Sequence, residues 1–215
     1  MVTDFILVRH GETDYNRLHV IQGWMDVPLN ETGHQQAAVT AEMLRGEMID
    51  EVWHSDLQRA AKTAEVILKN HPGVPAFPCV PLREWKLGII QNMSHEELEK
   101  VHPEYEEMLK TEAIDLAIPG GESRSEFQDR VNGIFQELAE RSPGKRILIV
   151  SHGGVLVRFY RFLCKECSVQ DHVPIPGNAS VSRARYDHET KKWTLIVWNQ
   201  IYTPQTVEKN TPPAL

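Results

Sequence analysis

The chain has 215 residues, 41% of them hydrophobic and 25% charged, which is typical of a globular protein with one domain or one domain carrying an insertion. Its formal net charge of −7 argues against a general nucleic-acid binder, which needs a basic face. No apolar run approaches the roughly 18 residues of a membrane helix, and no signal peptide is visible. Three cysteines cannot form a disulfide framework and suit a reducing compartment. We therefore expect a cytoplasmic protein that binds a small molecule, with no membrane or nucleic-acid partner.

Short apolar runs alternate with segments whose apolar residues recur at helical spacing. In the first half, this pattern predicts a strand at 4–9, a helix at 32–45, a strand at 51–54, a helix at 57–68 and a short strand near Cys79. Capping boxes at Ser94 and Ser123 predict that a helix begins at each serine, the second running to about Arg141. In the second half, we expect a strand at 146–150, a helix ending at 163 and strands at 179–186 and 193–198.

Alternating strands and helices predict an α/β three-layer sandwich, with a mostly parallel central sheet and helices on both faces. We expect a single domain over residues 1–202 and a loose C-terminal tail at 203–215, where the residues are polar and rich in proline. A mostly helical, acidic insertion interrupts the alternation at about 84–122.

Polar side chains follow three of the predicted strands at the point where each strand ends. The three segments are Arg9-His10-Gly11, His54-Ser55-Asp56 and Ser151-His152-Gly153. Ligands of open α/β sheets bind beyond the carboxyl ends of the strands, so we expect these side chains to face one crevice. The guanidinium groups of Arg9 and Arg59 match the oxygens of a phosphate group. Two arginines and two histidines at one sheet edge therefore predict a phosphate pocket.

Several blocks of residues, in a fixed order, also resemble a known family. They are Arg9-His-Gly-Glu-Thr13 with Asn16, Gln22-Gly23, Asp26-Val-Pro-Leu29, Ser55-Asp-Leu57 with Arg59, Leu82-Arg-Glu84 and Ser151-His-Gly153. Together they resemble the histidine phosphatase superfamily, in the branch that contains cofactor-dependent phosphoglycerate mutases and small-molecule phosphatases. The resemblance spans about residues 4–186 and implies a phosphoglycerate mutase-like fold.

The resemblance implies a role for each matching residue. His10 would be the nucleophile that accepts the phosphoryl group, and Glu84 would protonate the leaving oxygen. The phosphoryl oxygens would be held by Arg9, Arg59 and His152, and the pocket would be lined by Asn16, Gln22, Gly23 and Gly153. Phosphoryl transfer spreads negative charge over three oxygens, which these cationic groups can stabilise, so we expect neither a metal nor another cofactor. The residues after Glu84, Trp-Lys-Leu-Gly-Ile-Ile-Gln-Asn92, depart from the family's pattern.

Three functions fit this resemblance: a phosphatase for small phosphomonoesters, a cofactor-dependent phosphoglycerate mutase, or a phosphate-binding protein without activity. The insertion at 84–122 has ten acidic residues, three lysines and no arginine, hence a formal charge of −7. Such a segment is expected to repel the bisphosphate of a mutase and to suit a small phosphorylated metabolite with a neutral or apolar leaving group. We therefore favour the phosphatase. The chain length fits a monomer or a homodimer.

Three further features have a structural interpretation that we prefer over a functional one. Trp24 and Trp85 flank predicted site residues, but tryptophans more often pack in a core than line a substrate wall. The segment 119–122, Pro-Gly-Gly-Glu, is a turn first and a possible edge of the site second. Cys164 and Cys167 have the spacing of a metal or redox pair, but no second pair accompanies them.

Overall fold

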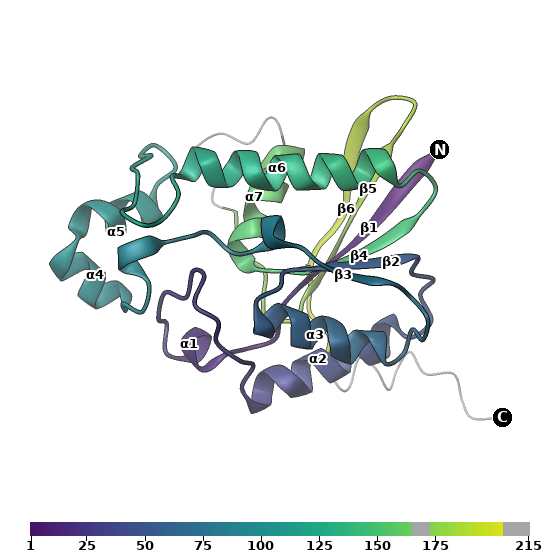
Figure 1. Ribbon diagram of the computed structural model, residues 1–215, viewed down its shortest axis with the longest axis horizontal. Helices are drawn as coiled ribbons and strands as arrows, with labels where there is room; N and C mark the ends of the chain where they lie inside the picture. Colours follow the sequence, from purple (N-terminus) through teal and green to yellow (C-terminus); the bar gives the residue numbers. More distant parts are fainter. Residues whose placement is uncertain (165–172, 204–215) are drawn as a thin grey trace.

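The computed structural model describes residues 1–164 and 173–203, which fold around one six-stranded sheet (Figure 1). The strands are β1 (Val2–Arg9), β2 (Glu51–His54), β3 (Ala76–Pro78), β4 (Arg146–Ser151), β5 (Val181–Asp187) and β6 (Lys192–Gln200). Their order in the sheet is β3-β2-β4-β1-β5-β6. The pairs β2–β3, β2–β4 and β1–β4 are parallel, whereas β1–β5 and β5–β6 are antiparallel. The sheet is thus mostly parallel, as the sequence predicts.

Helices cover both faces of this sheet. They are α1 (Asp14–Arg17), α2 (Glu31–Leu44), α3 (Gln58–Leu68), α4 (His95–Val101), α5 (Pro103–Lys110), α6 (Arg124–Arg141) and α7 (Gly153–Leu163), with 3₁₀ helices η1 (Val80–Leu82) and η2 (Gly88–Ile90). Figure 1 shows α2 and α3 on one face, α6 and α7 on the other, and α4 and α5 projecting beyond one end of the sheet. The predicted α/β three-layer sandwich is confirmed. In the described part of the chain, no helix is both long and apolar enough to cross a membrane.

The apolar runs of β1 and β4 supply both layers of the core. Phe5 and Leu7 of β1 pack in the cluster formed with α6 and α7, whereas Ile6 and Val8 pack in the cluster formed with α2 and α3. Residues 147–150 of β4 alternate between the same two clusters. Successive side chains of a strand point to opposite faces, so a central strand covered on both faces has to be apolar throughout. This is why the two strands are continuous hydrophobic runs.

The capping boxes mark two helix starts correctly. Ser94 and Ser123 are the N-caps of α4 and α6, and each serine hydroxyl accepts a hydrogen bond from the backbone N–H three residues later. Hydrophobic periodicity does not reveal α1 because the helix has only four residues, although Thr13 and Asn16 form a third capping box there. The predicted insertion at 84–122 contains η2, α4 and α5, followed by residues 111–123, which form no helix. Most of the expected tail, 204–215, lies outside the described residues.

The sheet order places three functional segments side by side. β2, β4 and β1 are neighbours, and the register pairs Arg9 with Ser151 and His54 with Val150. The residues that follow these strands therefore leave the same edge of the sheet together. This is the parallel-strand geometry in which ligands bind.

Candidate active site

A cavity of about 1090 Å³ opens at this edge of the sheet. Seven of the nine predicted site residues line it, namely Arg9, His10, Asn16, Gln22, Gly23, Arg59 and Glu84. The other two lie directly beside this group. The ring of His152 is 5.2 Å from that of His10, centroid to centroid, and a Cβ on Gly153 would lie 3.4 Å from Nε of Arg9. The structure thus brings all nine residues together.

His10 is buried, with 2% of its surface exposed, and has a defined tautomer. Its Nδ1 lies 2.7 Å from the carbonyl oxygen of Gly11. A carbonyl only accepts hydrogen bonds, so Nδ1 carries the proton and donates it. In the neutral ring, Nε2 then has a free lone pair, which is the state that a histidine nucleophile requires.

The surroundings of His10 keep its ring neutral. Burial lowers the pKa of His10 well below its usual value of 6.5, and the charges of Arg59 and Arg9 lower it further, against a smaller opposing effect of the Gly11 hydrogen bond. A lowered pKa means that the unprotonated ring persists into acidic solution. The ring of His10 is therefore unprotonated at any pH near neutrality.

We expect the ring-proton NMR signals of His10 in the free protein to titrate with a midpoint well below 6.5. Arg59→Met removes one of the neighbouring positive charges and is expected to move this midpoint upward, because protonation of the ring then meets less repulsion. A midpoint at or above 6.5 in the unmodified protein contradicts the assigned environment of His10.

The two ring nitrogens of His152, beside His10, have different surroundings. Its Nε2 lies 2.8 Å from the hydroxyl of Ser55, and its buried Nδ1 has no hydrogen-bond partner among residues 1–164 and 173–203. If the serine hydroxyl donates to Nε2, Nδ1 carries the proton and can donate to an oxygen of a ligand. Ser55, at the end of β2, therefore orients His152, a contact that the sequence does not reveal.

Arg9 and Arg59 supply permanent positive charge at this end of the cavity. Arg59 is 1% exposed and donates to the carbonyl oxygens of Met25 (2.7 Å) and Gly23 (2.9 Å). Burial lowers the pKa of Arg59 to about 10, so the group stays charged at neutral pH. The Nε atoms of Arg9 and Arg59 are buried and lack a partner within the described ranges. These two buried donors are therefore available to a molecule that enters the cavity.

Helix α7 adds backbone donors. His152 is its N-cap, so the N–H groups of Gly153 and Gly154 lie at a helix N-terminus, where the helix dipole favours an anion. A Cβ at Gly153 would crowd Arg9 and Ile175, and one at Gly154 would overlap the carboxylate of Glu84. The two glycines therefore let the helix end approach the arginine and the glutamate closely.

Asn16 and Gln22 are fixed through their side-chain oxygens. Thr13 donates from its backbone N–H and its hydroxyl to Oδ1 of Asn16, at 3.1 and 3.0 Å, and its hydroxyl also lies 3.1 Å from Oε1 of Gln22. Asn178 donates to the same Asn16 oxygen at 3.2 Å. With the oxygens engaged in this way, the amide nitrogens are the groups left to donate toward an anion.

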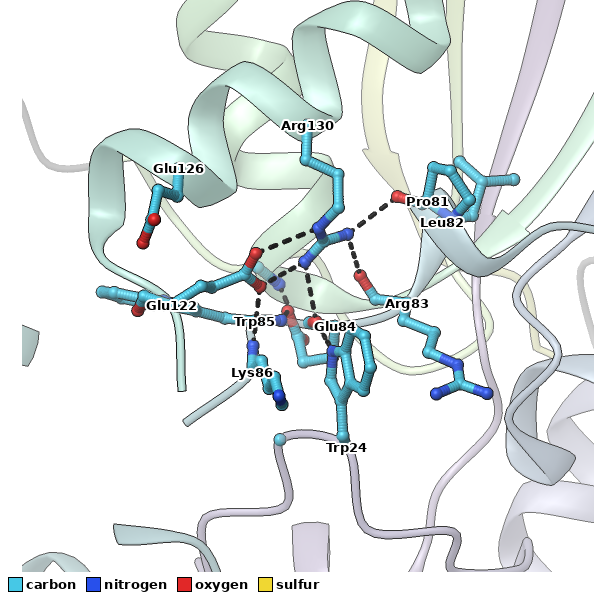
Figure 2. Close-up of polar contacts among 12 residues, drawn as sticks. Trp24, Pro81, Leu82, Arg83, Glu84, Trp85, Lys86, Glu122, Glu126 and Arg130 are labelled. Carbon is cyan, nitrogen blue, oxygen red and sulfur yellow. Dashed lines mark hydrogen bonds and ion pairs between the residues drawn. The ribbon is translucent and has the colours of Figure 1, made fainter. Parts of the chain in front are cut away.

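Glu84 is held through both its carboxylate and its backbone (Figure 2). One carboxylate oxygen accepts from the N–H of Gly154 (3.0 Å) and the other from the N–H of Trp85 (2.9 Å). The backbone carbonyl of Glu84 accepts from the indole of Trp24 (2.6 Å) and from Arg130 (3.1 Å). The carboxylate of Glu84 is thus fixed at the edge of the cavity.

Arg130 of α6 binds the backbone of the segment that carries Glu84. Figure 2 shows its guanidinium donating to the carbonyl oxygens of Pro81 (2.8 Å) and Arg83 (2.8 Å) and pairing with Glu122. Glu122 in turn accepts from the backbone N–H of Lys86 at 2.8 Å. Arg130 therefore fixes the backbone before Glu84 directly and the backbone after Glu84 through Glu122.

Several residues have functions other than those the sequence indicates. Trp24 holds Glu84, whereas Trp85 both lines the cavity and stacks on Phe127, so packing and lining are not alternatives for it. The turn at 119–122 contacts the segment around Glu84 through Glu122, which accepts from the N–H of Lys86 and pairs with Arg130. Cys164 is a free thiol, and Cys167 lies outside the described residues.

The far end of the cavity holds residues that the sequence does not single out. It is lined by Arg124, Arg158, Arg161, Lys110 and Glu112. The spacing of Arg158 and Arg161, one helical turn apart on the helix after His152, is the only signal in the sequence.

Known proteins are similar to this chain over most of its length. The family model of the histidine phosphatase superfamily (branch 1) matches residues 5–201. Phosphoglycerate mutase-like protein 4 of Arabidopsis thaliana is 35% identical over 92% of this chain and 85% of its own length. A metal-independent phosphoserine phosphatase of the same plant is 34% identical over 93% of this chain and 82% of its own length.

A solved structure agrees with the fold. A mycobacterial glucosyl-3-phosphoglycerate phosphatase, in complex with VO3, superposes with a TM-score of 0.79 and 30% identity, covering 92% of this chain and 98% of its own. The chain therefore belongs to branch 1 of the histidine phosphatase superfamily.

Proposed function

We propose that this protein is a cytoplasmic, metal-independent phosphatase that hydrolyses a small phosphorylated metabolite through a phosphohistidine on His10. The observation that carries the proposal is the neutral ring of His10, whose Nδ1–H is tied to Gly11 and whose Nε2 lone pair is available in a cavity lined by Arg9 and Arg59. The relative named as a metal-independent phosphoserine phosphatase and the mycobacterial phosphatase support hydrolysis.

In the first step, Nε2 of His10 attacks phosphorus while the bond from phosphorus to the ester oxygen breaks. Arg9, Arg59 and His152 stabilise the charge on the three phosphoryl oxygens. Glu84 gives its proton to the leaving oxygen, so that an alcohol departs. The proton stays on Nδ1 of His10, which continues to donate a hydrogen bond to the carbonyl oxygen of Gly11. This hydrogen bond stabilises the positive charge on the phosphorylated ring.

In the second step, water attacks the phosphohistidine. Glu84, now a carboxylate, takes a proton from the water as the phosphorus–nitrogen bond breaks, which restores the acid and the free Nε2. Inorganic phosphate is the product. Because Arg9 and Arg59 supply the positive charge and His152 a further hydrogen-bond donor, the proposed steps require no metal.

A phosphoglycerate mutase remains the second candidate, favoured by the similarity to phosphoglycerate mutase-like protein 4. A mutase must keep water from the phosphohistidine until a second hydroxyl accepts the group. The cavity of about 1090 Å³ is slightly larger than the usual small-ligand site of roughly 300–1,000 Å³, which leaves room for water beside a small product. The cavity lining also includes Ile175, which is 63% exposed, so water has access to this part of the cavity. Both features favour hydrolysis over a mutase.

The test is phosphate release from a panel of phosphomonoesters in excess EDTA, alongside the interconversion of 3- and 2-phosphoglycerate with bisphosphoglycerate as primer. We expect hydrolysis to exceed interconversion and to be unchanged by EDTA. Interconversion that is faster than hydrolysis identifies a mutase instead. Activity that EDTA removes and added metal restores overturns the metal-independent mechanism.

A further inference from the structure

The cavity carries far more positive charge than the sequence leads one to expect. Its lining includes the six cationic residues Arg9, Arg59, Lys110, Arg124, Arg158 and Arg161 but only the two carboxylates of Glu84 and Glu112. Arg9 and Arg59 account for one phosphoryl group. Of the other four cations, Lys110 pairs with Glu99 and Glu106. The three arginines, Arg124, Arg158 and Arg161, all contact the carboxylate of Glu112.

The acidic residues of segment 84–122 do not offset this charge because most of them face away. Six of the ten are exposed to solvent, namely Glu96, Glu97, Glu99, Glu104, Glu107 and Asp115. Glu106 is buried against His95 and Lys110, and Glu122 pairs with Arg130. The net charge of this segment, from which a neutral or apolar leaving group is expected, therefore does not represent the charge of the cavity lining.

Glu112 shows how an anion binds at the far end of the cavity. Both terminal nitrogens of Arg158 donate to its two carboxylate oxygens, which is the bidentate geometry of an arginine–carboxylate pair. Arg124 Nη1 lies 3.1 Å and Arg161 Nε 3.5 Å from the same carboxylate. Arg124 and Arg158 are each only 7% exposed. A protein carboxylate thus sits in a nearly enclosed arginine site inside the ligand cavity.

Arg124 and Arg158 differ in what else they hold. Arg124 also donates to the carbonyl oxygens of Met108, Thr111 and Ile114, so it fixes the end of α5 and the segment after it. Arg158 has its two terminal nitrogens on Glu112 alone, as far as the described residues show. The guanidinium group of Arg158 can therefore bind a different carboxylate in place of Glu112 without losing other hydrogen bonds of its terminal nitrogens within the described residues.

We propose that Arg158, flanked by Arg124 and Arg161, binds a carboxylate on the leaving group of the substrate, and that Glu112 occupies this subsite until substrate arrives. The proposal rests on the proposed function in one respect, namely that the phosphoryl end of the substrate lies at His10. Glu112 lies in the non-helical segment 111–123, so its side chain can leave without unwinding a helix. A substrate carboxylate that replaces it keeps Arg158 paired, which avoids the cost of a buried unpaired charge.

Binding of phosphonates tests the subsite without any need for turnover. The probes are ω-phosphonoalkanoic acids of increasing chain length, each compared with the n-alkylphosphonate of the same length by titration calorimetry. We expect at least one acid to bind about tenfold more tightly than its alkyl counterpart, which is typical of one hydrogen-bonded charge pair. The chain length with the largest preference measures the span from His10 to Arg158.

Two variants assign the preference to this subsite. Arg158→Met is expected to remove the preference and to leave alkylphosphonate binding unchanged, and Arg158→Lys to reduce it, because an ammonium group lacks the bidentate fork. Glu112→Gln removes the internal competitor and is expected to strengthen binding of the acids only. The matched controls are Arg141→Met and Glu107→Gln, at exposed positions of α6 and α5. Circular dichroism checks folding, and if Arg158→Met does not fold, Arg158→Lys and Glu112→Gln decide.

Equal binding of acids and alkylphosphonates at every chain length overturns the carboxylate subsite, as does a preference that survives in the Arg158 variants. Hydrolysis of the matching ω-carboxyalkyl phosphates is measured separately. If the acids are preferred through Arg158 but none of these esters is hydrolysed, the subsite stands and the proposed phosphatase function fails. If alkyl phosphates are hydrolysed without any preference for the acids, the function stands and the subsite fails.

Discussion

His10→Ala is expected to reduce hydrolysis by about 10⁴-fold or more, since it removes the atom that forms the covalent intermediate. The proposed steps offer no second nucleophile, because His152 has its Nε2 bound to Ser55 and the arginines stay protonated. The variant retains the arginines and the end of α7, so it is expected to bind inorganic phosphate still. Loss of turnover with retained phosphate binding is the pattern expected of a nucleophile.

The intermediate provides an independent measurement for the same variant. Rapid quenching of the unmodified protein with a labelled phosphomonoester is expected to trap phosphate in an acid-labile, base-stable bond, as a phosphoramidate requires. His10→Ala is expected to trap none, and the control His34→Ala, at an exposed position of α2, is expected to behave as the unmodified protein. Full activity in His10→Ala, or trapped phosphate that persists in it, contradicts the assignment.

Glu84→Gln is expected to lower kcat/KM for alkyl phosphates by about 10²- to 10⁴-fold, the usual contribution of a general acid. The loss on p-nitrophenyl phosphate is expected to be much smaller, because p-nitrophenolate leaves without a proton. The comparison uses kcat/KM because this constant reports the step that expels the leaving group. Equal losses on both substrates remove Glu84 from the role of acid.

The same substitution also tests the second step. Glutamine cannot accept a proton from water, so the phosphohistidine of Glu84→Gln is expected to hydrolyse slowly. With p-nitrophenyl phosphate, the variant is then expected to release a burst of p-nitrophenol and to accumulate phosphoenzyme. A variant that shows the leaving-group effect but no burst has Glu84 as the acid of the first step alone.

Arg130→Met extends this prediction to the residue that positions Glu84. Loss of its hydrogen bonds to the backbone of Pro81, Arg83 and Glu84 frees the carboxylate to move, so we expect a weaker form of the same leaving-group dependence. A structural defect alone would lower kcat/KM equally for alkyl and p-nitrophenyl phosphates. Arg141→Met, on the same helix but exposed and paired with Glu137, is the control.

The distribution of charge is compatible with binding of the phosphorylated substrate that we propose, although the whole protein is acidic. The chain has a net charge of −7, yet the described lining of its cavity is cationic. The arginines of the cavity are nearly enclosed, where solvent and salt screen charge least, whereas the acidic residues of α4 and α5 lie mainly in water. At short range, a ligand therefore meets the arginines rather than the average charge of the surface.

The amino-acid sequence by itself determined the strands, most of the helices and the residues at the phosphoryl end of the cavity. Hydrophobic runs and capping boxes are local signals, since burial on both faces of a sheet and helix capping depend on residues close together in the chain. The convergence of His10 and His152 also follows from sequence, because parallel strands that are neighbours in the sheet end at one edge. Segments as short as α1 leave too few residues for a periodic pattern.

Only the tertiary structure decided which charges line the cavity and what holds Glu84. The net charge of residues 84–122 does not say where each side chain points. It could not show that six of the acidic side chains are exposed to solvent. Nor could it show that Arg124 and Arg158, from two other helices, contact Glu112. In the same way, the contacts of Arg130 with residues 81–84 join segments almost fifty positions apart. Such contacts depend on how α6 and α7 pack against the sheet, and no local pattern in the chain encodes them.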